Sequence, residues 1–501
     1  MTEAAPDSTR NDWRRGWVAW GAIILLALGL RLYRIDWQSV WHDEIFTIYA
    51  CGRPLAELTE ILVRTDLNPP LHYYLLHGWF AVFGYGVLQA RLMSLCFGVL
   101  AVLFTGLLGR TLFGRRAGLT AALLLAVSTS GVMYSQEARC YSQLLFLSVA
   151  AIYFFVTAAR AHSILRWSLF VLCALGAAYT HYFGVLTPAV LACVALVHRR
   201  EYRIPAPWWV GGLLLGLALY APWLFSGVFE RLYENRRYLN PGGNSSTSAK
   251  WFSLLASVNW LNNGKWLGVH QPTPPWLVGL GVLLFTLPAG YGCRSVLRRT
   301  ASEGAEGSRR RSLVLLNALW LAPLVAIVLA GLLGLHFNFR YIVFLAAPYY
   351  VVAGKGLSEL EPLRLRGVWI LLVLIHSGIG LRAVYFLPFK EDYRAAVAHV
   401  AQRQRPGDCG VFLPARKWGE LPKFWYVYQR DSTPPRLVDA GSAAAGASGC
   451  ERVWLVWDRT WWLNREPAPS ASAKETLERS LTRVGGARYF EMEVGLYEPK
   501  R

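Results

Sequence analysis

The chain has 501 residues, of which 54% are hydrophobic and only 16% are charged. Soluble domains carry roughly 25% charged residues, so this composition is typical of a protein with many membrane-spanning helices. The formal net charge of +20 would suggest nucleic-acid binding in a soluble protein. Here the arginine clusters flank hydrophobic segments, as the positive-inside rule expects of cytoplasmic loops. We therefore exclude nucleic acid as a partner and expect these loops to contact membrane lipids.

Apolar runs predict a mainly α-helical, polytopic membrane protein with about eleven transmembrane helices. Nine runs are long enough to cross: about 16–33, 92–112, 117–134, 142–159, 207–225, 275–291, 313–335, 341–359 and 367–386. A further stretch, about 167–197, has basic residues at both ends, so we divide it into two short helices. The first run lacks a small-residue cleavage site and predicts an uncleaved signal anchor with a cytoplasmic N-terminus.

The apolar segment Leu71–Tyr85 is too short to be an ordinary crossing. Counting it as one would place the basic loop around Arg115 outside, against the positive-inside rule. We therefore predict a helix that lies in the outer interface or re-enters there, and whether it spans the membrane stays open. With this choice, segments 134–141 and 336–341 lie on the same outer face as the first loop, residues 34–90.

The composition changes after residue 386, which divides the chain into a transmembrane domain, 1–386, and a small α/β domain, 387–501, outside the membrane. Helix-like stretches lie at 392–404 and 475–484, and strand-like stretches at 410–413, 453–458 and 488–499. Cys409 and Cys450 each precede a strand-like stretch, and an oxidising periplasm would allow a disulfide there. No cysteine or histidine spacing is typical of a zinc site.

The first outer loop carries an adjacent acidic pair, Asp43 and Glu44. Neighbouring residues on a helix or strand point in different directions, so one carboxylate can act while the other has a structural role. An aspartate near the membrane surface suits a general base that takes a proton from a hydroxyl or amine. The alternative is a helix cap or a solvated interfacial charge.

The string Thr65–Tyr74 in the same loop is more specific. Its two prolines predict an extended approach followed by a helix start, with Asn68 as the N-cap. Free N–H groups at such a start favour an anion, for example a lipid phosphate. Asp66, His72 and Tyr73 belong to the same string. The alternative interpretation is a capped interfacial helix without a ligand.

Three more polar positions interrupt apolar runs on the predicted outer face. Glu137 and Arg139, close to Tyr141, predict either an internal salt bridge at a helix turn or a site for phosphate or sugar. Arg340, followed by Tyr341, either extends to lipid headgroups or holds a donor phosphate. His181 is either an interfacial histidine with satisfied hydrogen bonds or a site residue.

At these residues the sequence resembles the GT-C glycosyltransferases, specifically the protein O-mannosyltransferase and aminoarabinose-transferase superfamily. The resemblance covers roughly residues 16–390 and rests on the acidic pair, the Pro-Pro-Leu helix start and the many spans. It implies a polyprenyl-phosphate sugar donor, with Asp43 as base and Glu44 as its neighbour. The aminoarabinose enzymes carry Lys-Pro-Pro-Leu where this chain has Asn68-Pro69-Pro70-Leu71, so the resemblance does not extend to their sugar or acceptor.

The resemblance also assigns the remaining site residues. Asp66, Asn68 and His72 would form part of the site, and Arg139 and Arg340 would hold the donor phosphate. Some relatives bind a divalent metal ion, for which Asp43 and His72 are the candidate ligands. No nucleotide or organic cofactor is implied.

We therefore expect an inverting glycosyltransferase of the bacterial inner membrane that serves a glycan, lipid or protein acceptor at the outer face. A flippase or transporter for lipid-linked glycans is the first alternative, but transporters usually carry ionisable groups at mid-membrane depth, and the predicted spans contain hardly any. An O-antigen ligase or polymerase and a non-catalytic scaffold are further alternatives. The sequence predicts neither the sugar nor the acceptor.

Overall fold

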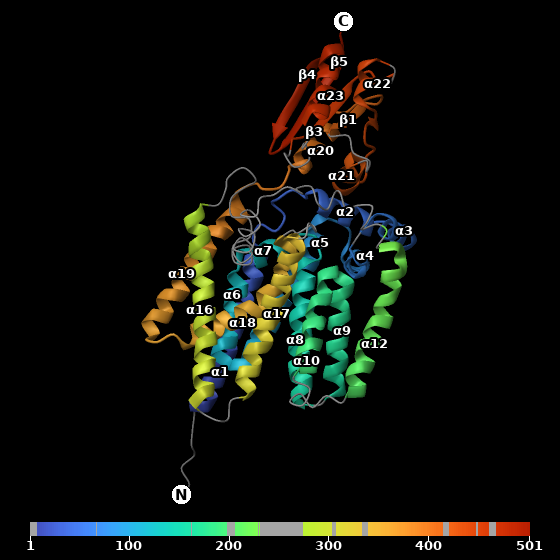
Figure 1. The fold of residues 1–501 in the computed structure, drawn as a ribbon. Helices are drawn as coiled ribbons and strands as arrows, with labels where there is room; N and C mark the ends of the chain where they lie inside the picture. Colours follow the sequence, from blue (N-terminus) through green and yellow to red (C-terminus); the bar gives the residue numbers. More distant parts are fainter. Residues whose placement is uncertain are drawn as a thin grey trace. The chain divides into compact units, whose positions relative to one another are not determined.

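The computed structural model describes residues 8–66, 68–161, 163–197, 206–228, 230, 274–302, 307–332, 339–413, 420–446, 449–459 and 467–500. They form two compact units, each of which is described by itself (Figure 1). Unit 1 consists of Met1–Ile35, Ala56–Trp79 and Arg91–Leu387. Unit 2 consists of Asp36–Leu55, Phe80–Ala90 and Pro388–Arg501. The predicted outer region 387–501 thus falls in unit 2 apart from its first residue, together with two segments of the first loop.

Unit 1 is helical. Its α-helices are α1 (Ser8–Leu32), α3 (Leu55–Thr65), α4 (Leu71–Phe83), α5 (Val87–Phe113), α6 (Arg115–Val127), α7 (Thr129–Ser135), α8 (Tyr141–Ala161), α9 (Ile164–Thr180), α10 (Leu186–Val197), α12 (Ala206–Trp223), α16 (Pro275–Ser302), α17 (Gly307–Leu332), α18 (Ala346–Glu359) and α19 (Leu363–Phe386). Short turns of other helix types are η1 (Tyr182–Val185), η2 (Leu224–Val228) and η3 (Phe339–Leu345). Helix α8 packs against both α9 and α10. The boundaries between the units fall inside α3, α4 and α5.

Among the described residues, seven helices are long and apolar enough to cross a membrane, or eight if the bent pair α6–α7 is one span. Three shorter apolar helices are Gly16–Leu32, Ile164–Thr180 and Tyr182–Val197. Each predicted crossing falls on one of these helices. The mainly α-helical, polytopic membrane fold is therefore confirmed, while the number of crossings stays a prediction.

The predicted crossing at 117–134 is bent, because the axes of α6 and α7 differ by 61°. The break frees backbone carbonyls, which must find partners within the protein at membrane depth. Arg31, buried on α1, donates to the carbonyls of Leu125 (3.3 Å) and Ala126 (3.0 Å). Its Nε also donates to the hydroxyl of Ser135 at 3.0 Å. This arginine therefore stabilises the bend.

Close helix packing in unit 1 depends on glycines of α18. A Cβ atom added at Gly356 would lie 1.7 Å from the carbonyl oxygen of Pro288 on α16. One added at Gly354 would lie 2.7 Å from the backbone nitrogen of Ala121 on α6. Small residues that let backbones approach closely are the usual basis of helix association in membranes.

Unit 2 contains a five-stranded sheet of order β2-β1-β3-β5-β4. Its strands are β1 (Cys409–Leu413), β2 (Arg436–Leu437), β3 (Val453–Asp458), β4 (Leu481–Tyr489) and β5 (Met492–Pro499), and its helices are α2 (His42–Cys51), α20 (Tyr393–Ala401), α21 (Glu420–Tyr428), α22 (Ala440–Ala444) and α23 (Pro467–Ser480). Strand β1 pairs in parallel with β2 and β3, whereas β5 is antiparallel to β3 and β4. Apolar side chains of β1, β3 and α23 form its core. A disulfide joins Cys409 to Cys450.

Most of the predicted elements of 387–501 are confirmed, including the α20 helix and strands β1 and β3. The predicted helix 475–484 is wrong in its second part, because α23 ends at Ser480 and Leu481 begins a strand. Antiparallel pairing with β5 across the whole of β4 overrides the local helix pattern there. Helices α21 and α22 were not predicted.

Candidate active site

Asp66 is the first residue of a buried polar cluster in unit 1. Its Oδ1 accepts hydrogen bonds from the backbone N–H of Asn68 (3.0 Å) and from the amide of the same side chain (3.1 Å). The hydroxyl of Tyr73 donates to Oδ2. Helix α4 begins only at Leu71, so the predicted N-cap at Asn68 is wrong. The reason is that the Asn68 amide is engaged by Asp66 instead.

Tyr73 connects Asp66 to a buried arginine. The Nη1 of Arg139, in the turn between α7 and α8, donates to the Tyr73 hydroxyl at 3.4 Å. Burial and the neighbouring Asp66 carboxylate raise the pKa of Tyr73 well above its usual value. The phenol therefore stays protonated, donating to the carboxylate while it accepts from the guanidinium. Glu137 is also buried, and its carbonyl accepts a bond from the Arg139 N–H at 2.8 Å.

His72 is the second residue of α4, and side chains of α8 and α9 fix its imidazole through hydrogen bonds. Its Nδ1 lies 2.9 Å from Oε1 of Gln143, whose amide nitrogen donates to the hydroxyl of Thr180 at 2.8 Å. All three side chains are buried. This chain of hydrogen bonds fixes the orientation of the imidazole between three helices that are far apart in sequence.

His181 occupies the junction of α9 and η1 among aromatic rings. Its ring centroid lies 5.0 Å from that of Tyr341 and 6.3 Å from that of Tyr141. The turn needs a glycine, because a Cβ at Gly184 would lie 2.0 Å from the carbonyl oxygen of Ala177. This close approach holds the η1 turn, and with it His181, against α9.

A second arginine lies against the same rings. The guanidinium carbon of Arg340, on η3, lies 5.6 Å from the ring centroid of Tyr341 and 5.9 Å from that of Tyr141. Arginine on an aromatic face is stabilised by the ring quadrupole and keeps its charge. The site therefore has two cations, Arg139 and Arg340, around one set of tyrosines.

Both histidines of the cluster are neutral at physiological pH. Burial lowers the pKa of His72 to about 4, an effect that the Gln143 hydrogen bond opposes and the Arg139 charge reinforces. Burial and the charges of Arg139 and Arg340 lower the pKa of His181 to about 3. Because Arg139 acts on both imidazoles, the two histidines belong to one electrostatic environment.

The structure thus brings most of the predicted site residues together in unit 1: Asp66, Asn68, His72, Tyr73, Glu137, Arg139, Tyr141, His181, Arg340 and Tyr341. The acidic pair lies in unit 2, where Glu44 is buried and accepts from Nζ of Lys390 at 2.7 Å. Asp43, its neighbour in the first turn of α2, is only half-buried. Glu44 therefore has the structural role, which leaves Asp43 as the candidate base.

Three polar residues of these arrangements were not singled out in the sequence: Gln143, Thr180 and Lys390. An isolated amide within the apolar run of α8 was the available signal for Gln143. The sequence does not single out Lys390, because a lysine shortly after the last predicted span resembles the basic residues that commonly flank membrane-spanning helices.

A divalent metal was predicted at Asp43 and His72. Within the described ranges, no group of three or more His, Cys, Asp or Glu side chains could hold a metal ion. The Arg139 charge beside His72 also disfavours a cation there. A metal ion at Asp43 and His72 stays a prediction, and we derive no step through one.

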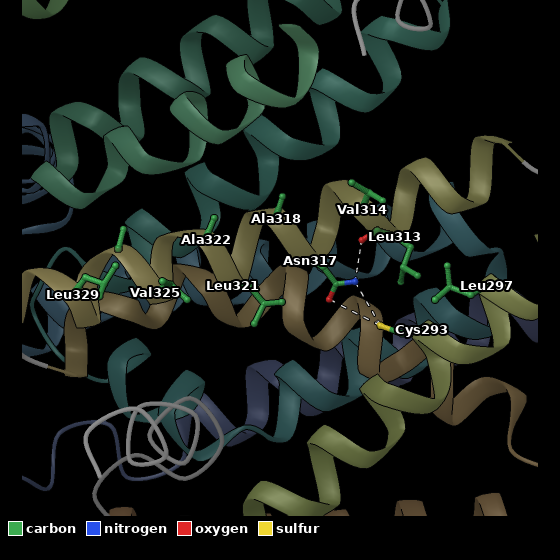
Figure 2. A pocket seen from close by; sticks show the side chains of 11 residues that line it. Cys293, Leu297, Leu313, Val314, Asn317, Ala318, Leu321, Ala322, Val325 and Leu329 are labelled. Atoms are coloured by element: carbon green, nitrogen blue, oxygen red, sulfur yellow. Dashed lines mark hydrogen bonds between the residues drawn. The ribbon is translucent and has the colours of Figure 1, made fainter. Parts of the chain in front are cut away.

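A large apolar hollow of about 770 Å³ lies between α16 and α17, and none of the cluster residues lines it (Figure 2). Its lining is aliphatic except for Cys293 and Asn317. The Asn317 amide donates to the Leu313 carbonyl at 3.0 Å and to the Cys293 sulfur at 3.5 Å, as Figure 2 shows. The aliphatic lining therefore favours an apolar group over a polar one.

Comparison with known proteins extends this picture. Residues 67–225 match the family model of dolichyl-phosphate-mannose-protein mannosyltransferase. The matched segment begins just before α4 and contains Tyr73, Arg139 and His181. Over this segment the chain is therefore similar to a family of glycosyltransferases that use a lipid-linked sugar. No curated protein matches its sequence.

Solved structures of similar fold cover nearly the whole length of the chain. ArnT from Cupriavidus metallidurans in the apo state matches with a TM-score of 0.61 and 15% identity, covering 98% of both chains. The same protein bound to undecaprenyl phosphate matches with 0.58 and 16%, covering 96% of this chain and 98% of that one. The Archaeoglobus fulgidus oligosaccharyltransferase AglB, in complex with an inhibitory peptide and a dolichol-phosphate, matches with 0.53 and 13%, covering 94% and 72%.

Proposed function

We propose that the enzyme transfers a sugar from a polyprenyl-phosphate donor to a hydroxyl or amine acceptor at the outer face of the bacterial inner membrane. The observation that carries this proposal is the buried cluster in which Arg139 and Arg340 surround a group of tyrosines and histidines. Similar structures contain undecaprenyl phosphate and a dolichol-phosphate, which supports the class of donor.

The arginines would stabilise the leaving group. As the bond between the anomeric carbon and the phosphate oxygen breaks, negative charge develops on the lipid phosphate. Arg139 and Arg340 supply positive charge in a buried setting, where it is worth more than in water. Tyr73, with Asp66 behind it, positions Arg139 through the hydroxyl.

Asp43 would act as the general base. The acceptor hydroxyl or amine attacks the anomeric carbon on the face opposite the phosphate, its proton passes to the Asp43 carboxylate, and the configuration inverts. Glu44 cannot substitute, because Lys390 neutralises it within the fold. No nucleotide or organic cofactor enters this reaction.

Two features support an external location of the region after residue 387. Unit 2 contains the Cys409–Cys450 disulfide, a bond that persists in oxidising compartments such as the periplasm. The positive-inside rule favours a cytoplasmic location for the loops that carry the arginine clusters.

The test is transfer of radiolabel from polyprenyl-phosphate sugars in membranes that contain the wild-type protein or Asp43→Asn. We expect the wild type to label an acceptor and Asp43→Asn to lower the rate by about 10²–10⁴-fold, the usual contribution of a general base. Glu44→Gln combined with Lys390→Met is the matched control and should keep activity. Equal rates for wild type and Asp43→Asn would reject this base, and no transfer by the wild type with any sugar would reject the proposed function.

A further inference from the structure

The hydrogen bonds around His72 determine which of its nitrogens carries the proton. The Thr180 hydroxyl donates to the Gly176 carbonyl at 2.7 Å, so its oxygen accepts from the Gln143 amide nitrogen at 2.8 Å. The Gln143 oxygen therefore faces Nδ1 of His72 at 2.9 Å, and Nδ1 must donate. In the neutral ring, Nε2 is then a hydrogen-bond acceptor.

In His181 the roles of the two ring nitrogens are reversed. Its Nδ1 accepts a hydrogen bond from the backbone N–H of Phe183 at 3.2 Å. The proton of the neutral ring is therefore on Nε2, which becomes a donor. Stacking of the imidazole on the Phe183 ring, with centroids 5.6 Å apart, and contact with Tyr341 hold this orientation.

Both Nε2 atoms are buried and, within the part of the chain that the structure describes, neither has a hydrogen-bond partner. The two side chains are each only 1% exposed. A buried polar atom without a partner destabilises the fold, so native proteins rarely contain two in one cluster. The hydrogen-bonded chain from His72 through Gln143 ends at Thr180, the residue before His181, which places both imidazoles in the same site. A polar ligand would satisfy one acceptor and one donor here.

We propose that His181 donates from Nε2 to an oxygen of the donor phosphate and that His72 accepts at Nε2 from a hydroxyl group of the donor sugar. This assignment rests on the proposed function. His181 is influenced by both arginines and offers a proton, which suits an anionic oxygen. The lone pair of His72 would repel a phosphate oxygen but complements a hydroxyl. The pair would therefore distinguish the phosphate end of the donor from its sugar end.

This division of roles predicts different defects in the two variants. The probe is undecaprenyl phosphate, which has the phosphate and no sugar, and its binding to the full-length protein in detergent is measured. His181→Phe should weaken binding by about tenfold, as loss of one hydrogen bond to a charged group implies. His72→Phe should leave this affinity unchanged within about threefold, yet lower transfer from the sugar-bearing donor at subsaturating concentration by at least about tenfold. His376→Phe, at a buried histidine of α19, is the matched control.

The conservative variants distinguish hydrogen bonding from packing. His181→Gln offers an N–H and His72→Gln offers a carbonyl oxygen, so both variants should keep most of the function that the Phe variants lose. The Gln variants also test the proposal if a Phe variant does not fold. A tenfold loss of undecaprenyl phosphate binding in His181→Gln, or of transfer in His72→Gln, would then overturn the role assigned to that histidine.

Other outcomes would also overturn the inference. Equal weakening of undecaprenyl phosphate binding by both Phe variants would reject the division of roles, and wild-type values for both would show that the histidines are structural. In either case transfer by the wild type would leave the proposed function intact. A wild-type protein that binds no undecaprenyl phosphate and transfers no sugar would reject both.

Discussion

Buried acids are held in different ways in the two units. In unit 1, the described hydrogen bonds to Asp66 come from an amide, a backbone N–H and a phenol. In unit 2, basic side chains hold the buried acids: Lys390 holds Glu44 (2.7 Å), Arg452 holds Asp408 (2.7 Å) and Arg483 holds Glu493 (2.9 Å). Ion pairs in unit 2 thus serve the fold, whereas in unit 1 the Tyr73 hydroxyl joins the Asp66 carboxylate to the Arg139 guanidinium.

The largest expected effect concerns the most deeply buried of these ion pairs. Lys390→Met leaves the Glu44 carboxylate buried without its cation, which should cost about 3–5 kcal/mol. Hydrogen exchange of the backbone amides of α2 measures this loss, because a lower free energy of local opening makes these amides exchange faster. Glu44→Gln added to Lys390→Met should restore most of it. An unchanged deficit in the double variant would show that Lys390 acts through packing and not through charge.

Loss of the disulfide should have the next largest effect. Cys409→Ser with Cys450→Ser removes a link across 41 residues, which should lower the stability of the sheet by about 2–4 kcal/mol. Exchange of β1 and β3 amides should accelerate, while that of α8 amides in unit 1 should not change. Equal acceleration in α8 would contradict the division of the chain into two separately stabilised units.

A smaller effect is expected at the phenol of unit 1. Tyr73→Phe removes the donor to Asp66 and the acceptor of Arg139, at about 1.5–3 kcal/mol for bonds to charged groups. Under the proposed function, transfer should fall by about 10–100-fold. Tyr74→Phe is the control, because its more exposed hydroxyl contacts only Thr59 among the bonds described. A similar fall in both variants would mean that the loss reflects the helix and not the cluster.

The smallest effect should be the acid response of unit 2. Burial opposes the charge of Asp408, but hydrogen bonds from Arg452, from the Arg405 N–H and from Trp454 lower its pKa below the usual value. Since the folded pKa is depressed, this stabilisation is complete above the unfolded pKa of about 3.9 and is lost as the pH falls through the folded value. The stability difference between wild type and Asp408→Asn should therefore shrink below about pH 4. A difference that stays constant from pH 7 to pH 3 would exclude this linkage.

The cluster of unit 1 shows how far sequence reasoning reaches. Arg139 and Arg340 were chosen because a charge that interrupts an apolar run needs a reason. The structure places Arg340 near the ring of Tyr141 and Arg139 at the hydroxyl of Tyr73. The same reasoning assigned Asn68 to a helix cap, because local spacing cannot reveal that its amide meets Asp66.

Hydrophobic periodicity and flanking charge determined by themselves that this chain is a helical membrane protein with a small α/β region after residue 386. These signals are local, since each span must supply its own apolar length and satisfy its own backbone. Only the tertiary structure decided the break between α6 and α7, the Glu44–Lys390 pair and the polarity of the two histidines. Those features depend on partners up to 346 residues apart, which no local pattern specifies.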